Sequence, residues 1–415
     1  MVRLKGFQKL TDIETASQTW LKALLIEPRK VYVPLQEALN RVLAEDIIAK
    51  EDLPRFDRSA VDGYALKAED TTGASQFKPV FLRLTDSDTV SPRQAKQIWT
   101  GNAVPKGANA VVMLENTKKH NGQIEVWVQS APTDNVSKKG EDIKKGENAA
   151  KAGTRLKPYH LGLLAALDNN EVKVAEKPKI AILATGNELV EVGSKPTENQ
   201  IFDSNKIILS AMCRELYAEP LDMGIAKDSM EAITEKIRTA LSNADAVITT
   251  GGTSVGGLDL VPDAVNKVGK PGVIIHGIAM RPAMPTALAA IGNKPVMILS
   301  GNPVAAIIGF EVFARPLICR MLGMPKEEGR PIVKAVMTRK TAASLGRKTF
   351  IRVRVTQKNS EYHAEPVSAR GSGAITTMTR ANGFVIVPEN REGIPEGETV
   401  TVHLFGNVET VSQNV

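Results

Sequence analysis

The sequence predicts a multidomain protein of the α/β plus β class, organised around a doubly wound, mostly parallel α/β domain. Three observations support this prediction. From Lys179 to Met321, short apolar runs alternate with segments of helical periodicity, which is the pattern of parallel strands joined by crossover helices. A glycine-rich loop, residues 249–259, directly follows one of these apolar runs. After Gly329 the pattern changes to short alternating strands, which indicates a separate all-β domain.

Composition excludes several classes of protein. The chain has 415 residues, of which 42% are hydrophobic and 24% charged, as is ordinary for a globular protein. Basic residues are interspersed with acidic ones and aromatic residues make up only 4%, so the net charge of +7 does not indicate a nucleic-acid partner. We find no secretory signal and no apolar run of about 20 residues, and therefore expect a cytoplasmic protein without a membrane partner. The two cysteines and five scattered histidines form no zinc motif.

The N-terminal part predicts a discontinuous helical domain that is interrupted by a β module. Thr11-Asp12-Ile13-Glu14 has the spacing of a capping box that opens a helix, and a second helix is expected to begin at Pro34. A third helix, near Pro158–Leu167, is expected to pack against the first two. The helical domain is assigned to residues 1–51 and 140–176, and the inserted β module to residues 52–139.

The β module contains strand patterns at Phe81–Leu84, Ala110–Met113 and Ile124–Val128. Asn121-Gly122, between the last two, is a hairpin signal. Two turns place a polar side chain beside a glycine: Asp62 precedes Gly63, and Thr100 precedes Gly101. On spacing alone, both are read as ordinary turn chemistry.

The α/β domain is assigned to residues 177–326, and its polar loops follow predicted strands. Asp228 is expected to cap one helix, and Asn302-Pro303 to open another. In an open α/β sheet, loops at the carboxyl ends of strands line a single crevice, so we expect these loops to meet there. The expected strands are Ile180–Leu183, Leu221–Ile225, Ala246–Thr249, Val273–Ile275, Ala287–Ile291 and Val296–Leu299, and the helices Asp203–Leu216, Asp228–Leu241 and Asn302–Met321. The loops are Thr185–Glu188, Asp228, Thr250–Asp259 and Ser300–Pro303.

The central loop reads Thr249-Thr250-Gly251-Gly252-Thr253-Ser254-Val255-Gly256-Gly257-Leu258-Asp259. Its glycines allow positive φ angles, so that successive N–H groups can converge on an anionic group, and its hydroxyls add donors. The loop thus suits phosphate, with Asp259 as a candidate Mg²⁺ ligand. It is neither a Walker A loop nor a dinucleotide-binding turn. A Gly-Gly pair alone fits a surface turn equally well, but the neighbouring loops favour a site.

The C-terminal domain is assigned to residues 327–415, with strands at Phe350–Val355, Phe384–Val387 and Thr399–Val402. Arg352 and Arg354 alternate with apolar residues in the first of these strands. That alternation is typical of a solvated strand face.

Taken in order, these motifs resemble the MoeA family of molybdopterin molybdenumtransferases, which is related to the E domain of gephyrin. The resemblance implies the four-domain layout above, with the C-terminal domain a small β barrel. It also implies an elongated homodimer whose cleft combines the β module of one subunit with the α/β and C-terminal domains of the other. The motifs that carry it span nearly the whole chain: Ser59–Ala65, Thr100-Gly101, Gly140–Ile143, Thr185–Glu188, Gly251–Asp259, Gly301–Val304 and Ala369–Gly373.

The resemblance further implies a function in molybdenum cofactor biosynthesis. Such proteins insert molybdate into adenylylated molybdopterin (molybdopterin-AMP), with Mg²⁺-dependent hydrolysis of the pyrophosphate and release of AMP. The molybdopterin adenylyltransferase is an expected partner. Tungstate remains an alternative to molybdate, because the two oxyanions share their charge and nearly their size.

By position, the resemblance assigns roles to individual residues of this chain. Glu188, Asp228 and Asp259 would hold Mg²⁺, and Arg281 would add a fixed positive charge. The implied catalytic residues are Asp62, Thr100, Asp142, Glu188, Asp228 and Asp259. The implied substrate-binding residues are Thr185, Gly186, Asp203, Ser204, Asn205, Gly251, Gly252, Thr253, Ser254, Gly256, Arg281, Pro282, Gly301, Asn302, Pro303, Arg370 and Ser372.

The chain departs from the family pattern at several positions. Arg281-Pro282-Ala283-Met284-Pro285 stands where the family commonly reads Lys-Pro-Gly-Lys-Pro. Gly277 stands where a lysine is frequent, and Ser300 where a proline is frequent. The missing lysines bear on substrate affinity and on the identity of the oxyanion rather than on the fold. Two other functions stay open: a Mg²⁺-dependent nucleotide or pyrophosphate hydrolase that uses only the α/β crevice, and a gephyrin-like scaffold or binding protein.

Overall fold

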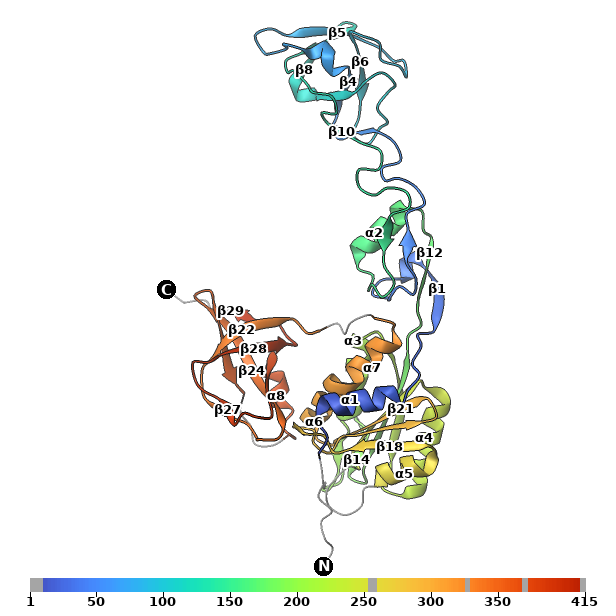
Figure 1. Cartoon of the computed structure of the whole chain (residues 1–415), viewed down its shortest axis with the longest axis vertical. Helices are drawn as coiled ribbons and strands as arrows, with labels where there is room; N and C mark the ends of the chain where they lie inside the picture. Colours follow the sequence, from blue (N-terminus) through green and yellow to red (C-terminus); the bar gives the residue numbers. More distant parts are fainter. Residues whose placement is uncertain (1–9, 253–259, 325–328, 368–371, 411–415) are drawn as a thin grey trace, which may run out of the picture. The chain divides into compact units, whose positions relative to one another are not determined.

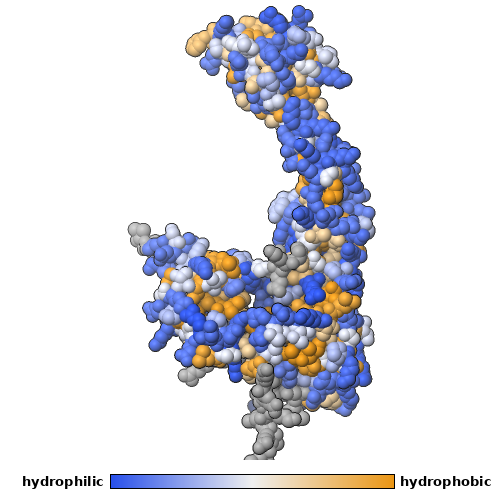
Figure 2. Space-filling view, viewed as in Figure 1, coloured by the Kyte–Doolittle hydropathy of each residue, from blue (hydrophilic) through white to orange (hydrophobic). Residues whose placement is uncertain are grey.

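The computed structural model describes residues 10–252, 260–324, 329–367 and 372–410. The chain forms two compact units, one of residues Met1–Val31 with Ala175–Val415 and the other of residues Tyr32–Val174 (Figure 1). On the face shown in Figure 2, hydrophobic residues form separate patches among hydrophilic ones. No helix within the described ranges is long and apolar enough to cross a membrane.

The β module of the Tyr32–Val174 unit is a six-stranded sheet. Asn121-Gly122 does form a hairpin, as predicted, but it joins β8 to β9, whereas Ala110–Met113 pairs with β4. The expected strand partner across the hairpin was therefore wrong. The sheet order is β7 (Ala110–Met113), β4 (Gly63–Leu66), β6 (Gln94–Ile98), β5 (Val80–Leu84), β9 (Gln123–Val126) and β8 (Thr117–His120).

The rest of this unit contains α2 (Pro158–Ala166), as predicted, but the expected helix from Pro34 is absent. The chain instead runs from β1 (Lys30–Pro34) into a 3₁₀ turn, Leu35–Glu37. Asn40 has a φ of 63°, and this left-handed conformation cannot continue a right-handed helix. The apolar residues of the segment are still buried, and Leu35 and Leu43 share a core with Leu164 of α2.

The first helix forms as predicted but packs elsewhere. Helix α1 (Ile13–Lys22) is capped by Asp12, whose carboxylate accepts a hydrogen bond from Thr15 N at 2.8 Å. It packs on strands of the α/β domain rather than on α2, because Trp20 is buried there and its Nε1 donates to Ala289 O at 2.7 Å. A buried indole needs such an acceptor. The expected packing of the first helix against the third was therefore wrong.

The α/β domain is built on a six-stranded mixed sheet that is parallel at one side and antiparallel at the other. All six predicted strands form, in the order β16 (Glu219–Ala226), β13 (Lys179–Thr185), β17 (Ala246–Thr250), β21 (Lys294–Leu299), β20 (Ala287–Ile291) and β18 (Pro271–His276). Pairings from β16 to β21 are parallel, and those that join β21, β20 and β18 are antiparallel. The carboxyl ends of the four parallel strands, β16, β13, β17 and β21, therefore lie on the same side of the sheet.

Helices cover both faces of this sheet (Figure 1). Helices α4 (Met230–Asn243) and α5 (Leu260–Val268) pack on one face, where they share a core with Ala181 and Leu183 of β13. Helices α1 and α3 (Asn205–Glu215) and a long helical segment contact the sheet separately. That segment comprises α6 (Pro303–Gly309), a π-helical turn (Phe310–Ala314) and α7 (Arg315–Met321). The sequence did not predict α5.

The C-terminal domain is a closed barrel. Its strands pair in the cycle β24 (Lys348–Lys358), β25 (Glu361–Pro366), β22 (Ile332–Met337), β28 (Thr399–Leu404) and β26 (Gly383–Val387), and β26 pairs again with β24. The short strand β19 (Met280–Arg281) extends from the α/β domain and pairs in parallel with β24. The barrel and the α/β domain are thus joined by backbone hydrogen bonds.

Candidate functional site

The loops at the carboxyl ends of the parallel strands line one cavity of about 660 Å³, which we call the crevice. This agrees with the expectation that these loops meet. Asp203, Ser204 and Pro303 do not line it. The candidates that do are Thr185, Gly186, Glu188, Asn205, Asp228, Gly251, Gly252, Gly301 and Asn302.

Two glycines of the central loop come too close to neighbouring atoms for any other residue. A Cβ atom at Gly251 would lie 2.4 Å from Thr185 O, and one at Gly252 would lie 2.3 Å from Val261 Cγ2. Both also have positive φ angles, 91° and 66°. The side chain of Thr185 is tied to the same loop, since its Oγ1 donates to Thr250 O at 3.3 Å. The backbone therefore forms the crevice wall directly.

Two carboxylates, Glu188 and Asp228, line the crevice. Asp228 was expected to cap α4, but the cap is Ser229, whose Oγ accepts from Ala232 N at 3.2 Å. Asp228 instead exchanges hydrogen bonds with Asn187: Asn187 N donates to Asp228 Oδ2 at 3.0 Å, and Asp228 N donates to Asn187 Oδ1 at 3.1 Å. This pairing fastens two crevice loops together and holds the Asp228 carboxylate at the cavity.

Asn205 offers a buried acceptor at the crevice wall. Its Nδ2 donates to Gly301 O at 2.8 Å, while its Oδ1 is buried and accepts no hydrogen bond from any residue that the structure describes. A buried polar atom without a partner is costly, so this oxygen suits an N–H or O–H group of a ligand. Burial raises the pKa of neighbouring Asp203, whose Oδ1 accepts from Lys206 N at 3.2 Å. Asp203 therefore supports the start of α3 instead of facing the cavity.

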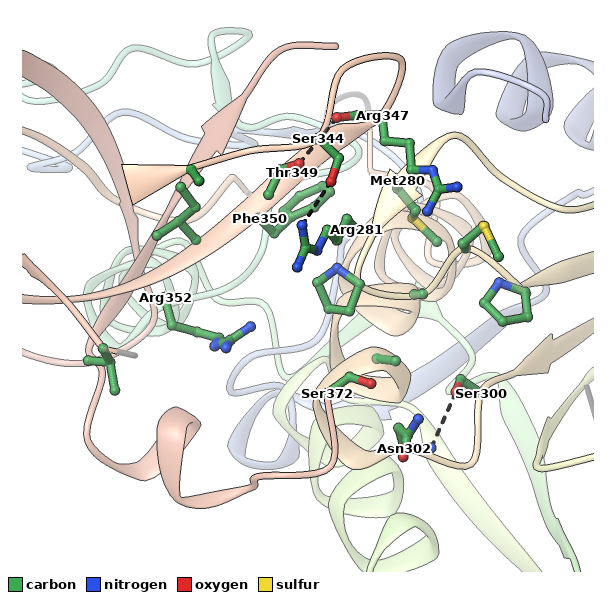
Figure 3. A pocket seen from close by; sticks show the side chains of 18 residues that line it. Met280, Arg281, Ser300, Asn302, Ser344, Arg347, Thr349, Phe350, Arg352 and Ser372 are labelled. Carbon is green, nitrogen blue, oxygen red and sulfur yellow. Dashed lines mark hydrogen bonds between the residues drawn. The ribbon is translucent and has the colours of Figure 1, made fainter. Parts of the chain in front are cut away.

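A second cavity of about 560 Å³ adjoins the crevice and shares Pro285, Ser300 and Asn302 with it. We call it the arginine cavity, because Arg281, Arg347 and Arg352 line it (Figure 3). Its other polar side chains are Ser300, Asn302, Ser344, Thr349 and Ser372, and none of the described residues that line it is acidic. Positive charge therefore concentrates here, and no described lining residue carries a carboxylate to neutralise it. Pro282 also lines this cavity.

Arg352 corrects the sequence interpretation of a solvated strand face. Its Nε is buried and has no hydrogen-bond partner among the described residues, and burial together with the nearby charge of Arg281 lowers its pKa. Arg354, two residues along, is exposed and pairs with Glu409, as expected of a solvated arginine. Arg347, which sequence reasoning missed, lies one residue before β24. The pairing of β24 with β19, which no pattern within either segment predicts, brings these arginines to Arg281.

Three further candidates, Asp62, Thr100 and Asp142, lie in the Tyr32–Val174 unit. Thr100 donates to Asp62 Oδ1 from both its backbone N, at 2.7 Å, and its Oγ1, at 2.6 Å. These bonds lower the pKa of Asp62, whose side chain is exposed. Asp142 is also exposed. The two polar turns that looked ordinary in sequence thus form one hydrogen-bonded pair.

Several expected residues lie outside the described part of the chain: Thr253, Ser254, Gly256, Asp259 and Arg370. Among the described residues, no group of three or more histidine, cysteine, aspartate or glutamate side chains is arranged to hold a metal ion. The carboxylates that the crevice offers are Glu188 and Asp228. Two carboxylates can hold Mg²⁺ when substrate phosphates and water complete its coordination.

The fold and the site together define a multidomain protein whose α/β domain carries a crevice of glycines and carboxylates beside a C-terminal barrel. Three family models match successive parts of the chain. They are the MoeA N-terminal region (domain I and II) at residues 11–167, a probable molybdopterin binding domain at 181–320, and the MoeA C-terminal region (domain IV) at 334–405. The chain belongs to the MoeA family.

Relatives that match over nearly the whole chain support the same family assignment. The chain is 38% identical to a Methanocaldococcus jannaschii protein named for molybdopterin biosynthesis, over 98% of this chain and 100% of that one. It is 32% identical to the molybdopterin molybdenumtransferase of Haemophilus influenzae, over 96% and 100%. The crystal structure of the molybdopterin biosynthesis moeA protein of Pyrococcus horikoshii OT3 is similar, with a TM-score of 0.81, 32% identity and coverage of 96% and 100%. The chain is an enzyme of this family.

Proposed function

We propose that this chain is a molybdopterin molybdenumtransferase of molybdenum cofactor biosynthesis. It would insert molybdate into adenylylated molybdopterin, hydrolyse the pyrophosphate with Mg²⁺ and release AMP. The family and the names of relatives at 32–35% identity support the class of enzyme. The observation that carries the finer proposal is that the arginine cavity, whose described lining residues include no acid, adjoins a crevice of glycines and carboxylates. One substrate can therefore reach a site for phosphates and a site for an oxyanion.

In the crevice, we assign the pyrophosphate to the glycine loop. The backbone of Gly251 and Gly252 forms the wall, and no side chain separates it from a ligand. Glu188 and Asp228 would hold Mg²⁺, with Asp259 proposed as a third ligand. Bound there, Mg²⁺ would offset negative charge on the phosphate that leaves. The acceptor Oδ1 of Asn205 would orient the substrate through one of its N–H or O–H groups.

In the arginine cavity, we assign the oxyanion to Arg281, Arg347 and Arg352. Guanidinium groups present several N–H donors in a fixed plane, and unneutralised donors favour a divalent anion. These arginines supply positive charge although lysine is absent at Gly277 and Met284. Charge alone does not separate molybdate from tungstate, so the proposal covers both.

We also propose a homodimer that brings Asp62, Thr100 and Asp142 of one subunit to the crevice of the other, and the adenylyltransferase as the source of the substrate. The two hydrogen bonds between Thr100 and Asp62 orient the Asp62 carboxylate, which suits a fixed role in such a site. Asp62→Ala and Glu188→Ala, each inactive alone, should restore activity when co-expressed, because mixed dimers contain one intact site. Failure of the mixture to recover activity would contradict the shared cleft.

The direct test follows AMP release by the purified protein from adenylylated molybdopterin and Mg²⁺, with molybdate, tungstate or neither. Release that depends on an oxyanion and is lost in Glu188→Ala would support the transferase and identify its metal. Release that is indifferent to both oxyanions would instead indicate a pyrophosphate hydrolase. Binding of substrate without release would indicate a binding protein.

A further inference from the structure

The side chain of Arg281 is held by a residue of the other domain. Arg281 Nη1 donates to Ser344 Oγ at 2.8 Å, and Ser344 lies between β23 (Thr341–Ala342) and β24 of the barrel (Figure 3). The backbone is fixed from the same side, because Arg281 pairs with Thr349 of β24 and Lys348 N donates to Ala279 O at 2.9 Å. The barrel therefore positions an arginine that belongs, by sequence, to the α/β domain.

The chemistry of this partner suits an anion site. Both Ser344 and Arg281 line the arginine cavity, and no carboxylate of the described residues pairs with Arg281. A carboxylate would hold the guanidinium firmly but would also cancel its charge. A hydroxyl holds one of its N–H groups and leaves the positive charge and the other donors to a ligand.

A restraint on Arg281 is needed because its neighbour repels it. The charge of Arg281 acts on Arg352 and helps to lower the pKa of that residue. Arg281 is itself exposed, so that without a restraint its long side chain could turn away into solvent. The hydrogen bond from Arg281 to Ser344 opposes this movement while the cavity is empty of anion.

We propose that Ser344 is a positioning residue of the oxyanion site: it orients Arg281 toward a divalent tetrahedral oxyanion without neutralising it. This inference rests on the proposed function, since it concerns the oxyanion that the transferase would consume. Ser344 acts through Arg281 and is not assigned a contact with the reacting atoms.

The experiment compares Ser344→Ala, Ser344→Thr and Ser344→Asp in the full-length protein. Molybdate binding is measured by calorimetry, and KM for molybdate and kcat by AMP release. We expect Ser344→Ala to raise both the dissociation constant and KM for molybdate by about 5–20-fold, with kcat unchanged. Ser344→Thr should stay within about 2-fold of the original, because it keeps the acceptor.

Ser344→Asp separates positioning from simple structural support. The new carboxylate should pair with Arg281 and preserve the melting temperature, yet weaken molybdate binding at least as much as Ser344→Ala does. Ser242→Ala is the matched control, because it removes an exposed hydroxyl that donates to Arg238 O at 3.0 Å on α4. Ser242→Ala should leave the dissociation constant and KM for molybdate, kcat and the melting temperature unchanged.

The outcomes separate this inference from the proposed function. Normal molybdate binding in Ser344→Ala and Ser344→Asp, with weakened binding in Arg352→Ala, would overturn the role of Ser344 and leave the oxyanion site standing. Tighter or unchanged molybdate binding in Ser344→Asp would also overturn it. No molybdate binding by the unmodified protein would overturn both proposals.

Discussion

The crevice and the arginine cavity adjoin each other but are assembled in different ways. The residues that line the crevice all belong to the α/β domain, mainly to loops that follow its strands. The arginine cavity takes Arg281 from the α/β domain and Arg347 and Arg352 from the segment that forms β24 of the barrel. The crevice is thus a property of one sheet edge, and the arginine cavity is a property of the contact between two domains. Changes to that contact should act on the two cavities unequally.

A second group of side chains, centred on Glu311, also joins the α/β domain to the barrel. Removing the charge of Glu311 should have the largest effect on stability. Glu311, half-buried in the π-helical turn, accepts hydrogen bonds from Arg330 Nη2 at 2.6 Å and from Arg315 Nε at 2.9 Å. Arg330 also lies over the Phe405 ring of the barrel domain, 6.0 Å from its centroid. We expect Glu311→Gln to lower the free energy of unfolding by about 3 kcal/mol, since buried Arg315 and half-buried Arg330 lose their closest counter-charge and keep only the longer contacts with Glu215. Urea denaturation measures the change.

The pH dependence of this effect provides a control. Burial alone would raise the pKa of Glu311, but the hydrogen bond and charge of Arg330 and the charge of Arg315 outweigh it and lower the pKa. A carboxyl with a lowered pKa in the folded state stabilises above its unfolded value, here 4.5, and that stability is lost as the pH falls through the folded pKa. The difference between Glu311→Gln and the original should therefore shrink below pH 4.5. A constant difference would contradict the ion-pair explanation.

Arg352→Ala should separate the two cavities most clearly in binding. Removal of its guanidinium from the arginine cavity should weaken molybdate binding on the order of 100-fold, because a charge-assisted hydrogen bond contributes about 1.5–3 kcal/mol. Binding of AMP in the crevice should be unaffected. Calorimetry with each ligand checks both statements. Arg354→Ala is the matched control, since that arginine pairs with Glu409 in solvent and should leave molybdate binding unchanged.

Glu188→Gln should act on the crevice and spare the arginine cavity. Loss of one proposed Mg²⁺ ligand should raise the Mg²⁺ concentration needed for half-maximal AMP release by about 10-fold. Molybdate binding should stay as it was. Glu235→Gln removes the same charge at an exposed position of α4 that lines neither cavity, and it serves as the control. If Glu188→Gln weakened molybdate binding as much as it raised the Mg²⁺ requirement, the two cavities would not be separate sites.

The smallest expected effect concerns the wall of the arginine cavity. Ala283 is buried and has a φ of 81°, in the left-handed region that a Cβ disfavours. Ala283→Gly should raise the free energy of unfolding by about 0.5–1 kcal/mol, because relief of strain exceeds the added freedom of the unfolded chain. Thermal unfolding measures it. Ala342→Gly, which changes an exposed strand alanine that lines the same cavity, should lower stability instead.

The comparison also explains which parts of the site could be predicted. The strands at Ile180–Leu183 and Ala246–Thr249 were visible because they are apolar runs, and the loops after them had to meet at one sheet edge. The prediction of a helix from Pro34 was wrong, since a buried apolar pattern does not distinguish a helix from a packed irregular segment. Arg352 was misread because alternation along one strand does not reveal which neighbour covers it.

The sequence by itself determined the α/β rhythm, the glycine loop and the family, because these depend on neighbours in the chain and on residue order. The tertiary structure decided that α1 packs on the α/β sheet, that Asp228 pairs with Asn187 rather than capping α4, and that three arginines share a cavity. The physical reason is the same in each case. These arrangements are contacts between segments far apart in sequence, and their free energy depends on which surfaces remain to be covered after the local elements have formed.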